Sequence, residues 1–412
     1  MTPYLDFGQR PACAVRSEGE MVYYEDEGLV FASAADWLRL FRAFVEHIAR
    51  RYGRENAAGW VYDLTQDIRT PIPTFCKDEA ELWEVYRQMV LCLRQHLPGA
   101  SVGGLGGVPV GDLAPMVRWL EYCKQNDCVP HHLTVLVFPY MKEENGAESE
   151  PRRLAREGEE ARQLHRCRTL LDKLGLPDCR VFAVEWNSSL STRNWLNDSC
   201  FRAAYALDVF NRTWGEADVI GVWMATDWCC SYYDTTHIAN GGNGLLTKDG
   251  IRKPVYHALD FLNRMGRQFL QKGDCYLATA AGDSDFYILC YNCKRYSYAY
   301  FQTPEDQLDL HRLPDLFEDG RDLQITFTLT GLRGTGRYAL KRRVVNSEQG
   351  SLLGAWSRFK YDADLDARDV QYLRNVCNPV LSLRKQKAEN GALSFTATLK
   401  PHEIALYHIF AL

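Results

Sequence analysis

A chain of 412 residues, of which 46% are hydrophobic and 25% charged, has room for one large globular domain and a smaller one. Its formal net charge of −5 argues against a basic nucleic-acid-binding surface, so no nucleic acid is predicted as a partner. The sequence has no apolar run of membrane-spanning length and no signal-peptide pattern at its start. We therefore predict a cytoplasmic protein without a membrane partner, whose 14 cysteines are reduced thiols.

Strand-like and helix-like patterns alternate along the first two-thirds of the chain. Short apolar segments predict buried strands at 3–7, 60–64, 101–104, 132–138, 180–185 and 219–223. Helical periodicity between them predicts helices at about 36–48, 82–93, 113–125 and 154–173, from Ser199 onward, and at about 255–265. Six strand–helix units predict a parallel α/β sheet with helices outside it, either doubly wound or a barrel that lacks two units.

The pattern changes after about residue 270. The segments that follow are short, alternating and separated by Gly, Asp, Asn and Pro: CYLATA, FYILCYN, YAYF, QITFTL, RYALKRRVV, LSFTATL and IALYHIF. This pattern is typical of an antiparallel β-sandwich, with predicted loops near 303–323 and 357–375. The sequence therefore predicts two domains, an α/β domain at 1–268 and a β-sandwich domain at 269–412.

A carboxylate closes one of the predicted strands. Glu185 follows four apolar residues at the carboxyl end of the strand 180–185, and Trp186 and Asn187 come next. In parallel α/β barrels this end of the strands carries the active site. The alternative is an ion-paired strand end, since a buried carboxylate needs a partner.

Glu185 and its surroundings, VFAVEWNSSLSTRNWLNDSCFRAAYAL, resemble the nucleophile strand of glycoside hydrolase family 39, which includes β-xylosidases and α-L-iduronidases. Further segments that resemble the family are HIARRYG (47–53), SVGGLGG (101–107), VWMATDW (222–228), NGGNGLLTKDGIRKPVYHALDFLNRMG (240–266) and LKPHEIALYHI (399–409). The resemblance implies a (β/α)8 TIM-type barrel with a C-terminal β-sandwich and a saccharide or glycoside ligand.

The family places its acid/base after barrel strand four and its nucleophile after strand seven. The matching segments here end the second and fifth predicted strands, so about six βα units are present. We therefore expect two units upstream of Met1, which would make this chain a truncated barrel. Retaining hydrolysis uses two carboxyl groups about 5–5.5 Å apart, one as nucleophile and one as acid/base.

The resemblance assigns Glu185 as nucleophile and Asp67 as a degenerate acid/base. Where the family has Asn followed by Glu, WVYDLTQDIRTP (60–71) has Gln66 and Asp67, so the acid is one methylene shorter. A misplacement of about 1 Å can cost on the order of 100-fold in rate. The residues expected to bind substrate are Gln66, Trp186, Asn187, Trp223 and Asp227. Trp223 has a core position as its alternative.

No metal or cofactor is predicted. His131 and His132 lack a third ligand nearby and are expected to lie in a loop that enters a strand, and the family's late histidine on that strand is replaced by Val137 or Phe138. The glycines of SVGGLGG do not lead directly into a helix as a dinucleotide site requires.

Two functions fit the sequence. The first is a retaining glycoside hydrolase of β-xylosidase type. The second is a catalytically weak or inactive sugar-binding sensor module of an AraC-type transcriptional regulator, because the stretches NDSCFRAAYAL and VFPY most resemble that subgroup. The sugar, the linkage and the oligomeric state are not predicted.

Overall fold

The structure is a computed structural model, which describes residues 2–7, 33–64, 76–107, 113–141, 152–155, 157–227, 237–332 and 336–412. Residue contacts divide the chain into two compact units. The sheet unit comprises Met1–Val137, Glu160–Trp186 and Gly215–Gly221, and the second unit comprises Phe138–Glu159, Asn187–Trp214 and Val222–Leu412.

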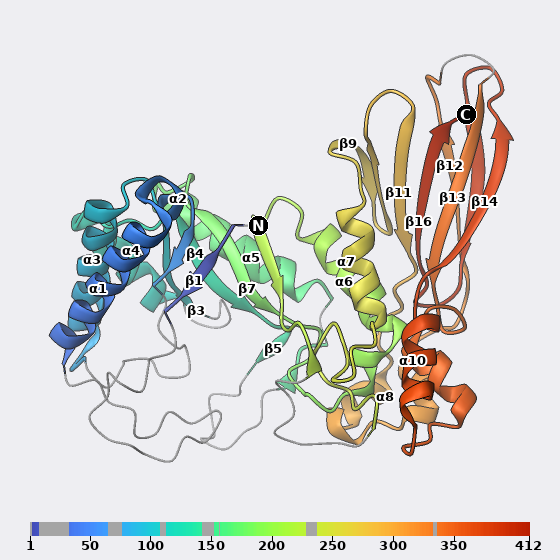
Figure 1. Ribbon diagram of the computed structural model, residues 1–412, viewed down its shortest axis with the longest axis horizontal. Coiled ribbons are helices and arrows are strands. Elements are labelled where there is room, and N and C mark those ends of the chain that lie inside the picture. Colours follow the sequence, from blue (N-terminus) through green and yellow to red (C-terminus); the bar gives the residue numbers. More distant parts are fainter. Residues whose placement is uncertain are drawn as a thin grey trace. The chain divides into compact units, whose positions relative to one another are not determined.

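A six-stranded, curled parallel sheet of half-barrel type forms the centre of the sheet unit (Figure 1). Its strand order is β1-β2-β3-β4-β7-β8, and every register pair from β1 to β7 is parallel. The strands are β1 (Tyr4–Asp6), β2 (Val61–Asp63), β3 (Ser101–Gly107), β4 (His132–Val137), β7 (Arg180–Trp186) and β8 (Val219–Val222). All six predicted strands and their parallel arrangement are confirmed.

Helices follow the strands as the periodicity predicts. They are α1 (Ala34–Tyr52), α2 (Arg54–Ala58), α3 (Glu79–His96), α4 (Ala114–Gln125) and α5 (Glu159–Lys173). Ser33 caps α1 by accepting a hydrogen bond from the Asp36 amide, and Asp78 caps α3 by accepting one from the Glu81 amide. Helices α1, α3 and α4 each bury an apolar stripe, which on α1 includes Trp37, Phe41 and Val45.

The two faces of this sheet differ in polarity. On the helix face, Leu133, Val135 and Val137 of β4 are all buried, and a Cβ on the adjacent Gly104 would press against the Tyr86 ring of α3. The alternating residues form the inner face, which carries Tyr4, Asp63, His132, Thr134 and Phe182.

Strand β4 begins at His132, in agreement with the predicted strand 132–138, so the interpretation of His132 as part of a loop that enters the strand is wrong. His132 opens strand β4, is fully buried on the inner face, and stacks on the Phe182 ring at a centroid distance of 4.2 Å. Burial lowers the pKa of His132 to about 4, so the ring is neutral at pH 7. A Cβ on Gly103 would overlap this ring, lying 2.6 Å from His132 Cε1. Strand β3 therefore needs glycine at this position.

We expect Gly103→Ala to lower the free energy of unfolding by about 1–3 kcal/mol, because the ring is held by Phe182 and overpacking of a full core carries that cost. Thermal unfolding followed by circular dichroism measures the effect. Gly320→Ala is the matched control, since a Cβ there meets no atom within 4 Å and its φ is not in the left-handed region. Equal melting temperatures for the two variants would contradict the packing described here.

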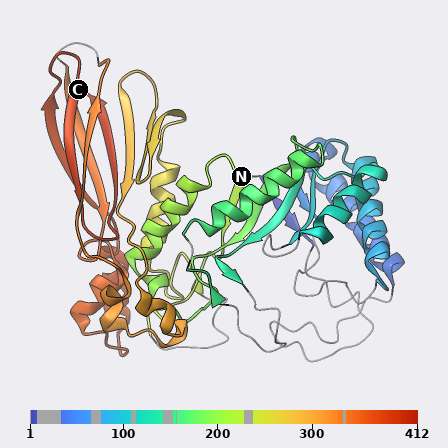
Figure 2. The same cartoon turned by 180° about the vertical axis from the view of Figure 1, so that it is seen from behind.

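The second unit contains a β-sandwich, as predicted, and two helices that pack on it (Figure 2). One antiparallel sheet has the order β14-β13-β16-β11-β10-β9, and β12 pairs with β15 in another. Their bounds are β9 (Gln268–Gly273), β10 (Tyr276–Ala280), β11 (Asp285–Tyr291), β12 (Leu323–Leu329), β13 (Arg337–Val345), β14 (Val380–Lys387), β15 (Leu393–Leu399) and β16 (Ile404–Ala411).

Shorter elements complete the second unit. These are β5 (Tyr140–Met141), β6 (Arg152–Arg153), α8 (Tyr298–Gln302), α9 (Leu352–Trp356) and α10 (Ala367–Val376). The prediction of a loop near 357–375 is wrong for its second half. Helix α10 forms there because Asp366 and Asp369 make a capping box, each side chain accepting from the other residue's backbone.

The apolar core continues across the predicted domain boundary between residues 268 and 269. Helices α6 (Cys200–Arg212) and α7 (Pro254–Asn263), which precede this boundary, pack against strands that follow it. Residues from both helices share one apolar cluster with strands β11, β13 and β16: Cys200, Ala203, Ala204, Leu207, Ala258, Phe261, Leu289, Tyr291, Val345, Ile404 and Leu406. Sequence alternation assigns these helices to the barrel domain, whereas their contacts group them with the sandwich. The domain boundary stays a prediction.

Within the described ranges, no helix is both long and apolar enough to cross a membrane. The described cysteines are free thiols, and most of them are buried.

Candidate active site

A β-bulge sits directly before Glu185. In the pairing of β4 with β7, Val135 lies opposite Ala183, but the next residue, Leu136, lies opposite Glu185, so Val184 is extra. Side chains alternate between faces along a strand, and one extra residue moves all later side chains to the other face. Without the bulge Glu185 would share the helix face with Ala183. With it, half-buried Glu185 shares the inner face with Leu136.

The same register places Trp186 on the helix face. Trp186 lies opposite Val137, which is buried there, and Trp186 itself is only 1% exposed. A side chain behind the sheet supports the strand from the side opposite Glu185. The expected contact between Trp186 and a substrate remains a prediction that this position does not favour.

Gly221 of β8 packs directly on the bulge. A Cβ at Gly221 would overlap the Val184 carbonyl oxygen and lie 3.1 Å from its carbonyl carbon. Only glycine leaves room for the backbone of β7 to protrude here. The bulge that aims Glu185 thus depends on a residue of the neighbouring strand.

Trp223 immediately follows β8 and is half-buried. The chain after it is locked to the glycine-rich segment 240–246 by backbone hydrogen bonds. Met224 N donates to Asn243 O at 3.2 Å, Leu245 N donates to Met224 O at 3.0 Å, and Asp227 N donates to Leu246 O at 2.9 Å. The position of Trp223 is therefore set by this second segment.

The glycines of this segment are needed for close packing. A Cβ at Gly241 would lie 2.6 Å from the Asn194 backbone nitrogen, and one at Gly242 would lie 2.6 Å from Asp227 Cγ. Because no side chain fits there, the segment NGGNG approaches both the residues before α6 and those after Trp223.

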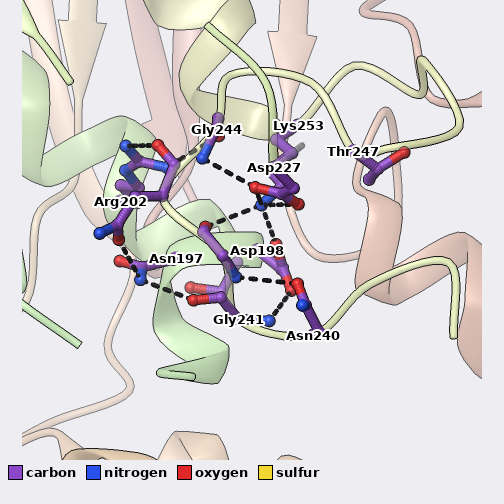
Figure 3. A network of polar contacts seen from close by, with 12 residues as sticks. Asn197, Asp198, Arg202, Asp227, Asn240, Gly241, Gly244, Thr247 and Lys253 are labelled. Carbon is purple, nitrogen blue, oxygen red and sulfur yellow. Dashed lines mark hydrogen bonds and ion pairs between the residues drawn. The ribbon is translucent and has the colours of Figure 1, made fainter. Parts of the chain in front are cut away.

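Lys253, Asp198 and Asp227 form a buried ion cluster next to this segment (Figure 3). The Lys253 side chain is fully buried, and its Nζ lies 2.5 Å from Asp198 Oδ1 and 2.7 Å from Asp227 Oδ2. Nζ also donates to the Gly242 carbonyl at 2.8 Å. Two carboxylates share one ammonium, and burial raises the pKa of Asp198.

Asp227 was expected to bind substrate, but its carboxylate already has protein partners. Besides Lys253, its Oδ1 accepts a hydrogen bond from Gly244 N at 2.7 Å, and the residue is 5% exposed. These hydrogen bonds and the ion pair do not show whether Asp227 also contacts a sugar. They do show that its carboxylate holds the loop after Trp223.

The segment after Glu185 is held by a second set of buried side chains. Asn197 Nδ2 donates to Ser191 O at 3.0 Å, to Gly241 O at 2.8 Å and to Asn243 Oδ1 at 2.8 Å. Arg153 of β6 donates to the Ser188 carbonyl, and its guanidinium lies 4.7 Å from the Tyr296 ring centroid.

Asn187, one of the predicted binding residues, has an unused hydrogen-bond donor. It is fully buried, and its Oδ1 accepts from Ser188 N at 2.8 Å, which leaves Nδ2 without a hydrogen-bond partner among the described residues. An unpartnered buried amide is costly unless a water or ligand completes it.

Gln66 and Asp67 lie outside the described residues, so their positions relative to Glu185 stay predictions. No group of three or more His, Cys, Asp or Glu side chains suited to a metal ion occurs within the described ranges.

Residues 1–394 match the sequence family described as Glycosyl hydrolases family 39. The chain belongs to glycosyl hydrolase family 39. The predicted resemblance is confirmed at the level of the family, and with it a saccharide as the class of ligand. Membership of the AraC-fused subgroup and absent upstream barrel units stay predictions.

Relatives of this family 39 protein are distant in sequence and similar in fold. A β-xylosidase of Geobacillus stearothermophilus is 21% identical over 417 residues, which cover 99% of this chain and 77% of that one. The GH39 enzyme from Xanthomonas axonopodis pv. citri superposes with a TM-score of 0.77 at 19% identity, covering 92% of this chain and 74% of that one. A monomeric β-xylosidase from Caulobacter crescentus CB15 gives 0.76 at 21%, covering 92% and 75%.

Sequence reasoning did not single out Gly221, which packs on Val184, or the buried pair of Asp198 and Lys253. The position of Lys253 could have indicated its role. Lys253 directly precedes the first turn of α7, and its side chain makes no capping hydrogen bond there. A cation is unfavourable at a helix N-terminus, so a lysine at that position needs carboxylate partners elsewhere.

Proposed function

We propose that the chain is a retaining glycoside hydrolase of β-xylosidase type, with Glu185 as nucleophile and Asp67 as acid/base. The observation that carries the proposal is the bulge at Val184, which turns Glu185 to the inner face at the carboxyl end of β7. Bulges that re-aim a side chain occur next to active sites. Family membership and the β-xylosidases among the relatives support the reaction and the sugar.

The proposed reaction proceeds by two displacements. A Glu185 carboxylate oxygen attacks the anomeric carbon as the bond to the leaving oxygen breaks, and Asp67 gives that oxygen its proton. The product is an ester between Glu185 and the sugar. Asp67, now a carboxylate, then takes a proton from water, whose oxygen attacks the same carbon and frees Glu185.

Other predicted residues have supporting roles in the proposal. The half-buried Trp223 offers its ring to the apolar face of the sugar, and Gln66 contacts a hydroxyl group. Asn187 would direct its unused Nδ2 toward a water or sugar oxygen. Trp186 and Asp227, both buried, act by holding the strand and the loop.

The test compares two substrates. An aryl β-xyloside has a good leaving group and needs little protonation, so the purified chain should release the aryl group slowly, with retention of configuration in the product. An unactivated xyloside needs the acid. We expect Asp67→Glu to speed its cleavage by roughly 100-fold, because the longer side chain restores about 1 Å of reach. Product configuration is measured by NMR before mutarotation.

The alternative function is a sugar-binding sensor module, and the observation in its favour is the Gln66–Asp67 pair in place of Asn–Glu. Binding of aryl xyloside without cleavage, unchanged in Asp67→Glu, would sink the hydrolase proposal and favour the sensor. A cytoplasmic location belongs to both proposals.

A further inference from the structure

The buried cluster of Lys253, Asp198 and Asp227 connects three stretches of the second unit. Asp198 precedes α6 in the segment that begins at Asn187, Asp227 ends the described stretch after Trp223, and Lys253 precedes α7. The third partner of Nζ is the Gly242 carbonyl, at 2.8 Å. One side chain therefore contacts the stretch that follows Asn187, the stretch that follows Trp223 and the glycine-rich segment.

The carboxylates extend these connections to the glycine-rich segment. Asp198 Oδ2 accepts from Gly241 N at 2.7 Å, and Asp227 Oδ1 accepts from Gly244 N at 2.7 Å. Arg202 of α6 donates to the carbonyls of Asn243 at 2.6 Å and Gly244 at 2.9 Å. The backbone groups of a buried segment must find partners, and here charged side chains supply them.

A contribution to folding stability does not by itself explain why this protein has a buried cluster of three charged side chains. Removing three charges from water carries a desolvation penalty that their attraction often fails to exceed, and well-packed apolar residues do equally well or better. Charged, directional bonds instead fix geometry. The cluster lies where the backbone after Trp223 and the backbone after Asn187 must be held at fixed places.

We propose that Lys253 is a positioning residue for the glycosidase site, holding the Trp223 and Asn187 segments through Asp198, Asp227 and the Gly242 carbonyl. This inference rests on the proposed function. Loss of Lys253 lets both segments relax while Glu185 and Asp67 remain. The expected result is a fall in kcat of roughly 10- to 100-fold for aryl β-xyloside, since misplacement by about 1 Å has effects of that size.

The role of Lys253 is tested with two variants, so that a result is obtained even if one of them does not fold. Lys253→Met leaves two buried carboxylates without their cation and lowers Tm. The triple variant Lys253→Met, Asp198→Asn, Asp227→Asn leaves no buried charge, and its amide oxygens still accept from Gly241 N and Gly244 N. Both are assayed well below their Tm, so that the chain is folded during the assay.

Two controls separate positioning from stability. Arg342→Met breaks an ion pair with buried Glu403 in the sandwich and lowers Tm, but it should leave kcat unchanged. Lys248→Met removes a partly exposed pair with Asp249 in the same loop and should change neither quantity. If the Lys253 variants keep wild-type kcat and KM while losing Tm, the inference is overturned and the cluster is merely structural.

Binding of D-xylose, measured by titration calorimetry, keeps this inference distinct from the proposed function. A wild-type chain that binds xylose without cleaving xyloside overturns the hydrolase alone. The inference then predicts roughly tenfold weaker xylose binding in the Lys253 variants and unchanged binding in Arg342→Met. Equal binding in all variants, or no binding by the wild type, overturns the inference.

Discussion

Replacing Glu185 by alanine is expected to lower kcat for aryl β-xyloside by roughly a thousandfold or more, with little change in Tm. Nucleophile removal in covalent catalysis has effects of this order or larger, because no other group forms the intermediate. The side chain is half-buried and lies on the inner face, so its loss leaves space without a large apolar cavity. Steady-state kinetics of aryl release measures the effect.

Small anions distinguish a missing nucleophile from a damaged site. In Glu185→Ala, azide should occupy the space of the carboxylate, attack the anomeric carbon and yield α-xylosyl azide with restored aryl release. Glu121→Ala, an exposed position on α4, is the control and should retain wild-type kcat. A Glu185→Ala protein that keeps more than about a tenth of the activity would exclude Glu185 as nucleophile.

The sequence predicts the six strands of the parallel sheet, the main helices between them and the place of Glu185 at a strand end. The segment YAYF, expected as a strand, is wrong, because it lies in helix α8. The sequence also does not predict the direction in which Glu185 points. RVFAVEW has apolar residues at four successive positions, since both faces of β7 are covered, so no alternation marks the register. The extra residue Val184 is visible only when β7 is paired with β4. Without the bulge, Trp186 and Glu185 exchange faces.

The sequence pattern also did not predict which polar side chains are buried. His132 looks like a loop residue because polar histidines precede an apolar run, yet Gly103 opposite it and Phe182 beside it create a space of its shape. Asp198 and Lys253 lie 55 residues apart in the chain, and the sequence around each of them does not indicate that they form an ion pair. Such pairs depend on tertiary contacts, which periodicity does not encode.

A second large effect is expected from Gly221→Ala. The new Cβ would overlap the Val184 carbonyl oxygen and lie 3.5 Å from Val184 Cα, so the bulge must move. Val184 directly precedes Glu185, and a backbone shift of about 1 Å there should lower kcat by on the order of 100-fold. Overpacking should also lower the free energy of unfolding by about 1–3 kcal/mol.

Comparison with Gly103→Ala separates a loss of stability from a change in the orientation of the Glu185 side chain. Both variants add one methyl group to the same parallel sheet, and both press on a neighbouring strand. Gly103 contacts His132 at the amino end of β4, whereas Gly221 contacts the residue before Glu185 at the carboxyl end of β7. We expect similar losses of Tm but a large loss of kcat only in Gly221→Ala. If both variants lose kcat equally when fully folded, the bulge has no special part in orienting the nucleophile.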